Sequence, residues 1–105
     1  MFQVYAPNAT SEYEAFVDEV NDALSRVANS ESIVLLGEFN AHVGTDNKTW
    51  KDVIGRHGIA IANENGQYLL QLCSSNGLSI INTFSSTKMF TNTRGTDRVW
   101  GKNLL

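Results

Sequence analysis

An apolar run of this 105-residue chain ends in a segment with three residues whose side chains could take part in catalysis or ligand binding. They are a carboxylate, Glu38, an amide, Asn40, and an imidazole, His42. Residues two apart on a strand face the same side, so Glu38 and Asn40 would share a face, and His42 would join them if the extension continued. Hard cations take oxygen ligands, so a carboxylate and an amide together can hold a hydrated Mg²⁺ and a phosphate oxygen. The alternative is an ordinary turn followed by a surface histidine.

Two predicted strands would position these residues. Residues 32–37 form a continuous apolar run, which is typical of a strand covered on both faces. Ligand sites in layered α/β proteins lie beyond such strand ends. Residues 2–6 alternate and are rich in β-forming residues, so they predict a short strand that Pro7 and Asn8 end. Tyr5 would then lie near a strand end, beside a turn.

Two helices are predicted as well. Ser11 and Glu14 have the spacing of a capping box, and the apolar residues after them have helical spacing. This apolar stripe, which would pack on a sheet, consists of Tyr13, Phe16, Val17, Val20, Leu24 and Val27. Residues 68–73 predict a second helix, with Asn65 as its N-cap and Gly77 as a left-handed residue at its C-terminal end.

The remaining segments complete an alternating pattern. Residues 44–66 form a long polar connection. Three residues are expected to anchor part of it, namely Trp50, Val53 and Ile54. Residues 78–83 and 88–93 predict two further strands, whereas residues 95–105 have no clear period and predict no element. The order strand, helix, strand, helix, strand favours the α/β class.

Composition limits the kinds of function. The formal net charge is −3 and no basic stripe is present, so charge alone would not draw the chain onto nucleic acid. This argues against a simple nucleic-acid-binding module, but not against a phosphodiesterase whose bound cation supplies positive charge locally. Cys73 is the only cysteine and is expected to be a buried helical residue. An intracellular location fits, and neither a signal peptide nor a membrane-spanning run is predicted.

Several motifs occur in the order known from one superfamily. Residues 37–42, Gly-Glu-Phe-Asn-Ala-His, are similar to a Gly-Asp-Phe-Asn-Ala-His signature, and residues 3–8 are similar to a Tyr-x-Pro-Asn segment. Residues 63–66, 76–78 and 82–84 are similar to segments that come later in the same proteins. Together they resemble the endonuclease/exonuclease/phosphatase superfamily, in the branch of LINE-type retrotransposon endonucleases and the craniofacial-development-protein-2-like proteins derived from them. The resemblance extends over residues 2–90.

The resemblance implies a fold and an activity. The fold would be a partial α/β sandwich, roughly one sheet with two packed helices, over residues 1–94, followed by a divergent tail over residues 95–105. The activity would be hydrolysis of DNA phosphodiester bonds supported by Mg²⁺ or Mn²⁺. An intracellular protein with this activity could act in the nucleus.

The resemblance also implies roles for individual residues. Glu38 stands where the family has an aspartate that orients or activates the nucleophile, and it could also bind the metal. Asn40 would contact the scissile phosphate or the attacking water, and Tyr5 would stabilise the phosphate in the transition state. Asn8 and His42 would assist substrate binding. The alternatives are that Tyr5 is a strand aromatic that caps the core and that His42 is a partly buried histidine bonded to its loop.

Departures from the family pattern predict impaired activity. Glu38 replaces the signature aspartate, and no segment matches the family's early metal-binding glutamate or its late aspartate and histidine. A second hypothesis is therefore a catalytically inactive, retroelement-derived remnant that acts as a scaffold or protein-interaction module. A third is an unrelated small α/β binding domain. A sheet that lacks its partner sheet would also expose apolar surface, which predicts self-association or a partner chain that covers it.

Overall fold

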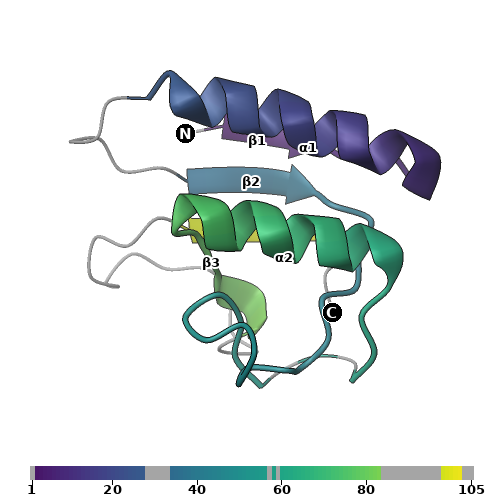
Figure 1. Cartoon of the computed structure of the whole chain (residues 1–105), viewed down its shortest axis with the longest axis vertical. Helices are drawn as coiled ribbons and strands as arrows, with labels where there is room; N and C mark the ends of the chain where they lie inside the picture. Colours follow the sequence, from purple (N-terminus) through teal and green to yellow (C-terminus); the bar gives the residue numbers. More distant parts are fainter. Residues whose placement is uncertain (1, 28–33, 57, 59, 84–97, 103–105) are drawn as a thin grey trace.

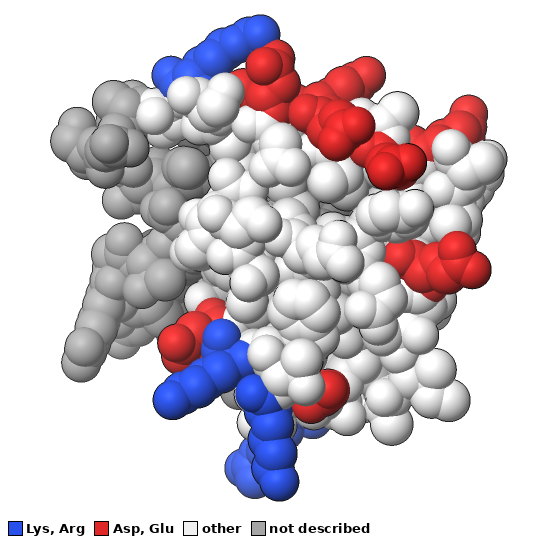
Figure 2. Space-filling view, viewed as in Figure 1, with Lys and Arg blue, Asp and Glu red and all other residues white. Residues whose placement is uncertain are grey.

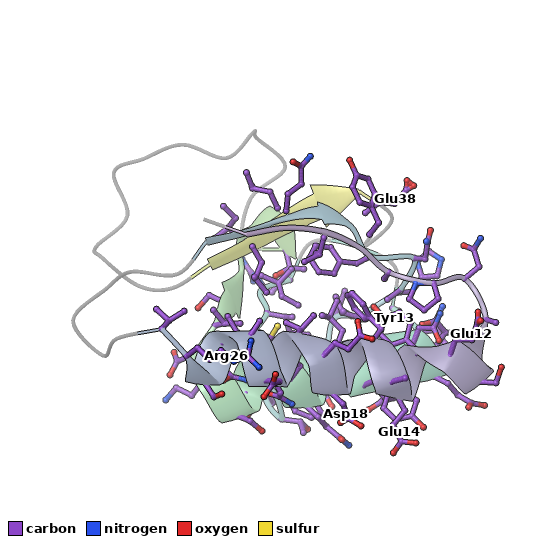
Figure 3. All side chains as sticks on the ribbon, turned by 90° about the horizontal axis from the view of Figure 1, so that it is seen from above. Glu12, Tyr13, Glu14, Asp18, Arg26 and Glu38 are labelled. Atoms are coloured by element: carbon purple, nitrogen blue, oxygen red, sulfur yellow. The ribbon has the colours of Figure 1, made fainter. Side chains whose placement is uncertain are left out.

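The computed structural model describes residues 2–27, 34–56, 58, 60–83 and 98–102. Two helices cover one face of a parallel sheet with the strand order β1-β2-β4-β3 (Figures 1 and 3). The strands are β1 (Phe2–Tyr5), β2 (Val34–Glu38), β3 (Ser79–Ile80) and β4 (Arg98–Lys102). The two helices are α1 (Thr10–Ser25) and α2 (Glu64–Asn76), and a 3₁₀ turn, η1 (Ile81–Thr83), follows β3. The predicted α/β class, one sheet with two packed helices, is confirmed.

Strands β1 and β2 are paired in parallel, with Tyr5 in register with Glu38. Gly37 makes this approach feasible, because a Cβ atom there would lie 1.8 Å from the carbonyl oxygen of Val4. The predicted strand at residues 32–37 is observed from Val34 to Glu38, and residues 32 and 33 lie outside the described residues. The sequence predicts that both faces of this strand are covered, but the two faces differ. Leu35 is fully buried on the helix side, whereas Leu36 on the opposite face is half-buried.

Strand β4 is an element that the sequence pattern misses. No element is predicted in residues 95–105, yet Arg98–Lys102 pairs with β2 on one side and with β3 on the other. The segment is too short to show a period of its own, and its pairing partners lie far away in the sequence. The strand predicted at residues 88–93 lies outside the described residues, and the domain boundary predicted at residue 94 remains a prediction.

Helix α1 buries its predicted stripe against the sheet. Tyr13, Val17, Val20 and Leu24 are buried, and Phe16 packs against the core at the edge of Tyr13, with 5.2 Å between ring centroids. The predicted capping box is wrong, because the helix begins at Thr10 with Ala9 as its N-cap and no side-chain cap. Ser11 therefore already lies in the first turn and cannot occupy the cap position.

Helix α2 begins earlier than predicted. Its N-cap is Asn63, whose side chain accepts a hydrogen bond from the Gly66 amide at 2.8 Å, so the assignment of Asn65 as N-cap is wrong. The helix ends as predicted at Gly77, which has a left-handed φ of 67°. Cys73 is a fully buried helical residue, as expected.

The segment after α2 is only partly a strand. The predicted strand at residues 78–83 is limited to Ser79–Ile80, and the 3₁₀ turn η1 replaces its second half. Thr83 explains the turn, because its buried hydroxyl donates to the Ile80 carbonyl at 2.6 Å and accepts from the Gly55 amide at 2.9 Å. The long connection is anchored as predicted, with Val53 and Ile54 buried and Trp50 packed against the core.

Candidate active site at the end of the sheet

The candidate residues on β1 and β2 meet at the carboxyl-terminal edge of the sheet. Parallel strands end at the same edge, and here the Ala6 amide continues the pairing by donating to the Glu38 carbonyl at 2.9 Å. Tyr5 and Glu38 are in register, so their side chains leave the sheet on the same face. Figure 3 shows Glu38 on the side of the sheet opposite α1. Tyr5 is 74% exposed, so it does not cap the core.

Asn40 links the ends of the two strands. Strand β2 ends at Glu38, and Asn40 turns the chain with a positive φ of 49°, a conformation that asparagine tolerates better than most residues. Its side-chain amide donates a 2.9 Å hydrogen bond to the Ala6 carbonyl. The extended continuation that would place Glu38, Asn40 and His42 on one face is therefore absent at these residues. Asn40 instead reaches across to the segment after β1.

Helix α1 holds the backbone between Glu38 and Asn40. The Phe39 side chain is fully buried, and the Phe39 carbonyl accepts a 2.7 Å hydrogen bond from the Tyr13 hydroxyl, which is itself buried. A helix from the first third of the chain thus holds the strand end that carries two candidate residues.

A second buried side chain, Asn65 in the first turn of α2, holds the same region from the other helix. Its amide nitrogen donates to the Asn40 carbonyl at 2.9 Å and to the Asn8 carbonyl at 3.1 Å. Asn8 itself is exposed, but its backbone is tied to the site by this bond. The sequence pattern predicts that Asn65 is a helix cap and does not predict this contact. The signal that could have found it is the motif at residues 63–66, which belongs to the resemblance.

His42 lies against the start of α2. Its backbone amide donates to the Asn63 side chain at 3.1 Å, and its carbonyl accepts from the Asn63 amide at 3.0 Å. Gly66 permits this approach, because a Cβ atom there would lie 1.8 Å from the His42 carbonyl oxygen. The Nδ1 atom of His42 is buried and has no hydrogen-bond partner among the described residues. These contacts support the loop, while a role of His42 in substrate binding remains a prediction.

A divalent cation is compatible with this edge. Within the described ranges, no three carboxylate, imidazole or thiol side chains gather around one point. Mg²⁺, however, usually keeps several waters and needs only one or two carboxylates together with substrate phosphate oxygens. Glu38, half-buried at the end of β2, can provide such a carboxylate.

Charge is distributed unevenly over the molecule. Figure 2 shows mainly acidic side chains along α1, with one basic side chain at the end of the helix, and basic side chains beside acidic ones at the opposite end of this view, over the loop between β2 and α2. Lys48, Lys51 and Arg56 are the exposed basic residues of that loop. The same loop also carries two exposed acidic residues, Asp46 and Asp52, so basic and acidic side chains are mixed there. Neither described helix is long and apolar enough to cross a membrane.

Comparisons with known proteins identify relatives of this chain. A family model described as endonuclease-reverse transcriptase matches residues 1–103. Craniofacial development protein 2 of Bos taurus is 30% identical over 86 residues, which cover 79% of this chain and 14% of that protein. Its counterpart in Tragulus javanicus is 29% identical over 86 residues, with 15% of that protein covered. The chain thus spans a small part of the curated relatives it matches. No solved structure matches it.

Proposed function

Because the chain belongs to the endonuclease-reverse transcriptase family, we propose that it is part of a metal-dependent endonuclease domain that hydrolyses DNA phosphodiester bonds. The family match confirms the resemblance to endonuclease/exonuclease/phosphatase proteins that the motifs predict. One observation carries the proposal, namely that hydrogen bonds tie the segments after β1 and β2 into one edge. The candidate residues at this edge are Tyr5, Asn8, Glu38 and Asn40.

Each residue has a task that its chemistry suits. The Glu38 carboxylate would orient the attacking water and accept its proton. The Asn40 side chain would contact a non-bridging oxygen of the scissile phosphate, and the exposed Tyr5 hydroxyl would donate a hydrogen bond to the charge that develops there. Asn8 would hold the neighbouring phosphate. A Mg²⁺ or Mn²⁺ ion, held by Glu38, water and phosphate oxygens, would neutralise phosphate charge when bound.

A specific observation favours a second candidate, a catalytically inactive remnant that serves as a scaffold or interaction module. Glu38 stands where the family signature has aspartate, and one methylene moves a carboxylate by about 1.5 Å. A misplacement of about 1 Å can reduce a rate about 100-fold. The first proposal therefore requires that Glu38 reach the reactive position with a different side-chain conformation.

Nicking of a supercoiled plasmid separates the two candidates. The chain would be assayed with Mg²⁺, with Mn²⁺ and with EDTA, beside Glu38→Gln and Glu38→Asp. Glu14→Gln is the matched control, because Glu14 is an exposed carboxylate on α1, away from the sheet edge. The nuclease proposal expects metal-dependent nicking that falls at least about 100-fold in Glu38→Gln and is unchanged in Glu14→Gln.

The Glu38→Asp variant reports on the replaced aspartate. If the extra methylene alone impairs the site, this variant should nick about 10-fold to 100-fold faster than the parent chain. Absence of nicking by the parent and by Glu38→Asp, with either metal, would support the inactive remnant. Equal nicking with EDTA and with Mg²⁺ would contradict a metal-dependent endonuclease.

A further inference from the structure

Asn65 makes an unusual set of contacts for a residue in the first turn of a helix. It is only 5% exposed, and its amide nitrogen points out of α2 to two backbone carbonyls that lie 57 and 25 residues away, those of Asn8 and Asn40. One carbonyl belongs to the segment after β1 and the other to the segment after β2. The Asn65 side chain thus binds both of the segments that form the carboxyl-terminal edge of the sheet.

The two hydrogen bonds that Asn65 donates stabilise the sheet edge and do not cap α2. Asn65 does not cap α2, since Asn63 does, and its own Oδ1 atom is buried without a hydrogen-bond partner among the described residues. A buried oxygen without a partner reduces stability. An apolar side chain of similar size would fill the same space without a buried, unpaired oxygen. The contribution of Asn65 therefore lies in the two hydrogen bonds that its nitrogen donates.

These bonds hold the backbone at Asn40, whose side chain makes its own 2.9 Å hydrogen bond to the Ala6 carbonyl. The carbonyl of Asn40 is fixed by Asn65, and the carbonyl of the preceding residue, Phe39, is fixed by Tyr13. Two consecutive carbonyls are therefore held by two different helices. Asn40 has a left-handed backbone, so the direction of its side chain depends on keeping this uncommon conformation.

We propose that Asn65 is a positioning residue of the candidate active site, which keeps Asn40 and the segment of Asn8 in register at the sheet edge. The inference rests on the proposed function. Asn65 does not touch the reacting atoms and acts through the two carbonyls that it binds. Its loss should therefore lower kcat while KM for DNA changes little, because a misplacement of about 1 Å can reduce a rate about 100-fold.

Asn76 provides a matched control from the other end of the same helix. It also donates two hydrogen bonds, to the Asn21 side chain at 2.7 Å and to the Leu72 carbonyl at 2.8 Å, but neither partner belongs to the sheet edge. Asn76→Ala therefore removes a similar number of contacts from α2 without touching the candidate site. A purely structural role of Asn65 would make the two variants behave alike at equal stability.

The first measurement compares steady-state plasmid nicking by the 105-residue chain, Asn65→Ala, Asn65→Asp and Asn76→Ala at a temperature at which each is folded. Asn65→Asp keeps the volume of the side chain and removes both donors at neutral pH. We expect kcat to fall about 10-fold to 100-fold in both Asn65 variants, with KM within about 3-fold of the parent. Asn76→Ala should keep the parent kcat. A kcat in Asn65→Asp equal to that of the parent would overturn the inference.

The second measurement does not depend on nuclease activity. In ¹⁵N-edited NMR spectra, the side-chain amide signals of Asn40 should shift in both Asn65 variants and stay in place in Asn76→Ala. In the parent chain, the Asn65 side-chain protons should exchange with water at least about 10-fold more slowly than those of the exposed Asn8 and Asn63. Fast exchange of the Asn65 protons would overturn the inference even if the variants fail to fold. Slow exchange and shifted Asn40 signals in a chain that does not nick DNA would refute the proposed function and retain the positioning role.

Discussion

Tyr13 is a buried residue whose ionisation is linked to the position of a strand end. Its hydroxyl is held under the end of β2 by the Phe39 carbonyl at 2.7 Å. Burial, and to a lesser extent the neighbouring Cys73 thiol, raises the pKa of Tyr13 well above its ordinary range. Burial likewise raises the pKa of the Cys73 thiol. In both groups the protein interior disfavours the charged form.

These shifts predict a loss of stability in alkaline solution. Because each pKa is higher in the folded chain, the unfolded chain releases its protons first as the pH rises. The stability is therefore complete below about pH 8 and declines from about pH 9 upward, through the ordinary pKa values of cysteine and tyrosine. Urea unfolding between about pH 7 and pH 11 measures the slope, which should be shallower in Tyr13→Phe. An unchanged slope in that variant would show that Tyr13 is not the responsible group.

At the scale of residues, the sequence was informative where a role depends on local order. Glu38, Asn40 and Tyr5 could be singled out because a strand end and a motif place them, and the structure puts all three at one edge of the sheet. The contacts of Asn65 and Tyr13 could not be predicted. Their partners lie 25, 57 and 26 residues away, and no local pattern encodes such distances.

At the scale of elements, two glycines test how closely the segments are packed. Gly66 lies where a Cβ atom would meet the His42 carbonyl oxygen at 1.8 Å, whereas Gly77 has no heavy atom within 4 Å of that position and needs only a left-handed backbone. Gly66→Ala should therefore lower the free energy of unfolding by about 3 kcal/mol or more. Gly77→Ala should cost about 1 kcal/mol.

Thermal and urea unfolding of the two variants under identical conditions provide the comparison. The larger loss in Gly66→Ala would show that α2 and the segment after β2 are in direct backbone contact. If Gly77→Ala were the more damaging change, the close approach of Gly66 to His42 would be wrong.

Elements with a strong local pattern were predictable, and those defined by distant pairing were not. The stripe of α1 and the C-terminal glycine of α2 indicated their helices correctly. The cap residues of both helices differ from the predicted ones for different reasons. Helix α1 begins after Ala9, which has no capping side chain, whereas near the start of α2 both Asn63 and Asn65 have cap chemistry and Asn63 is the cap. Strand β4 was missed because it forms only where β2 and β3 pair with it.

At the scale of the whole molecule, the helices cover one face of the sheet, and the side chains that the structure describes on the opposite face of β1 and β2 are more exposed. Leu36 is half-buried, and Tyr5 and Glu38 leave the sheet on the face opposite the helices. We expect the chain to self-associate through this face at high concentration, since exposed apolar sheet surface favours association. The order of elements predicted the α/β class, but not the strand order, because β4 enters between strands that precede it in the sequence.

Sedimentation velocity over a concentration series from about 10 to about 200 μM measures this association. Leu36→Gln should raise the dissociation constant about 10-fold, because removing a buried leucine side chain from an interface costs about 1.5 kcal/mol or more. The exposed Ile61, which is 76% accessible and lies outside the sheet, provides the control variant Ile61→Gln. A chain that remains monomeric throughout this range would contradict the expectation.

The central claim is that the shared end of β1 and β2 is a phosphodiesterase site. Its most direct test is the rate of Mg²⁺-dependent nicking of a supercoiled plasmid by the chain and by Asn40→Ala, with Asn76→Ala as the control and with the folded state of each verified by circular dichroism. We predict that nicking falls at least about 100-fold in Asn40→Ala and is retained in Asn76→Ala. Nicking by a folded Asn40→Ala variant at the parent rate would contradict the claim.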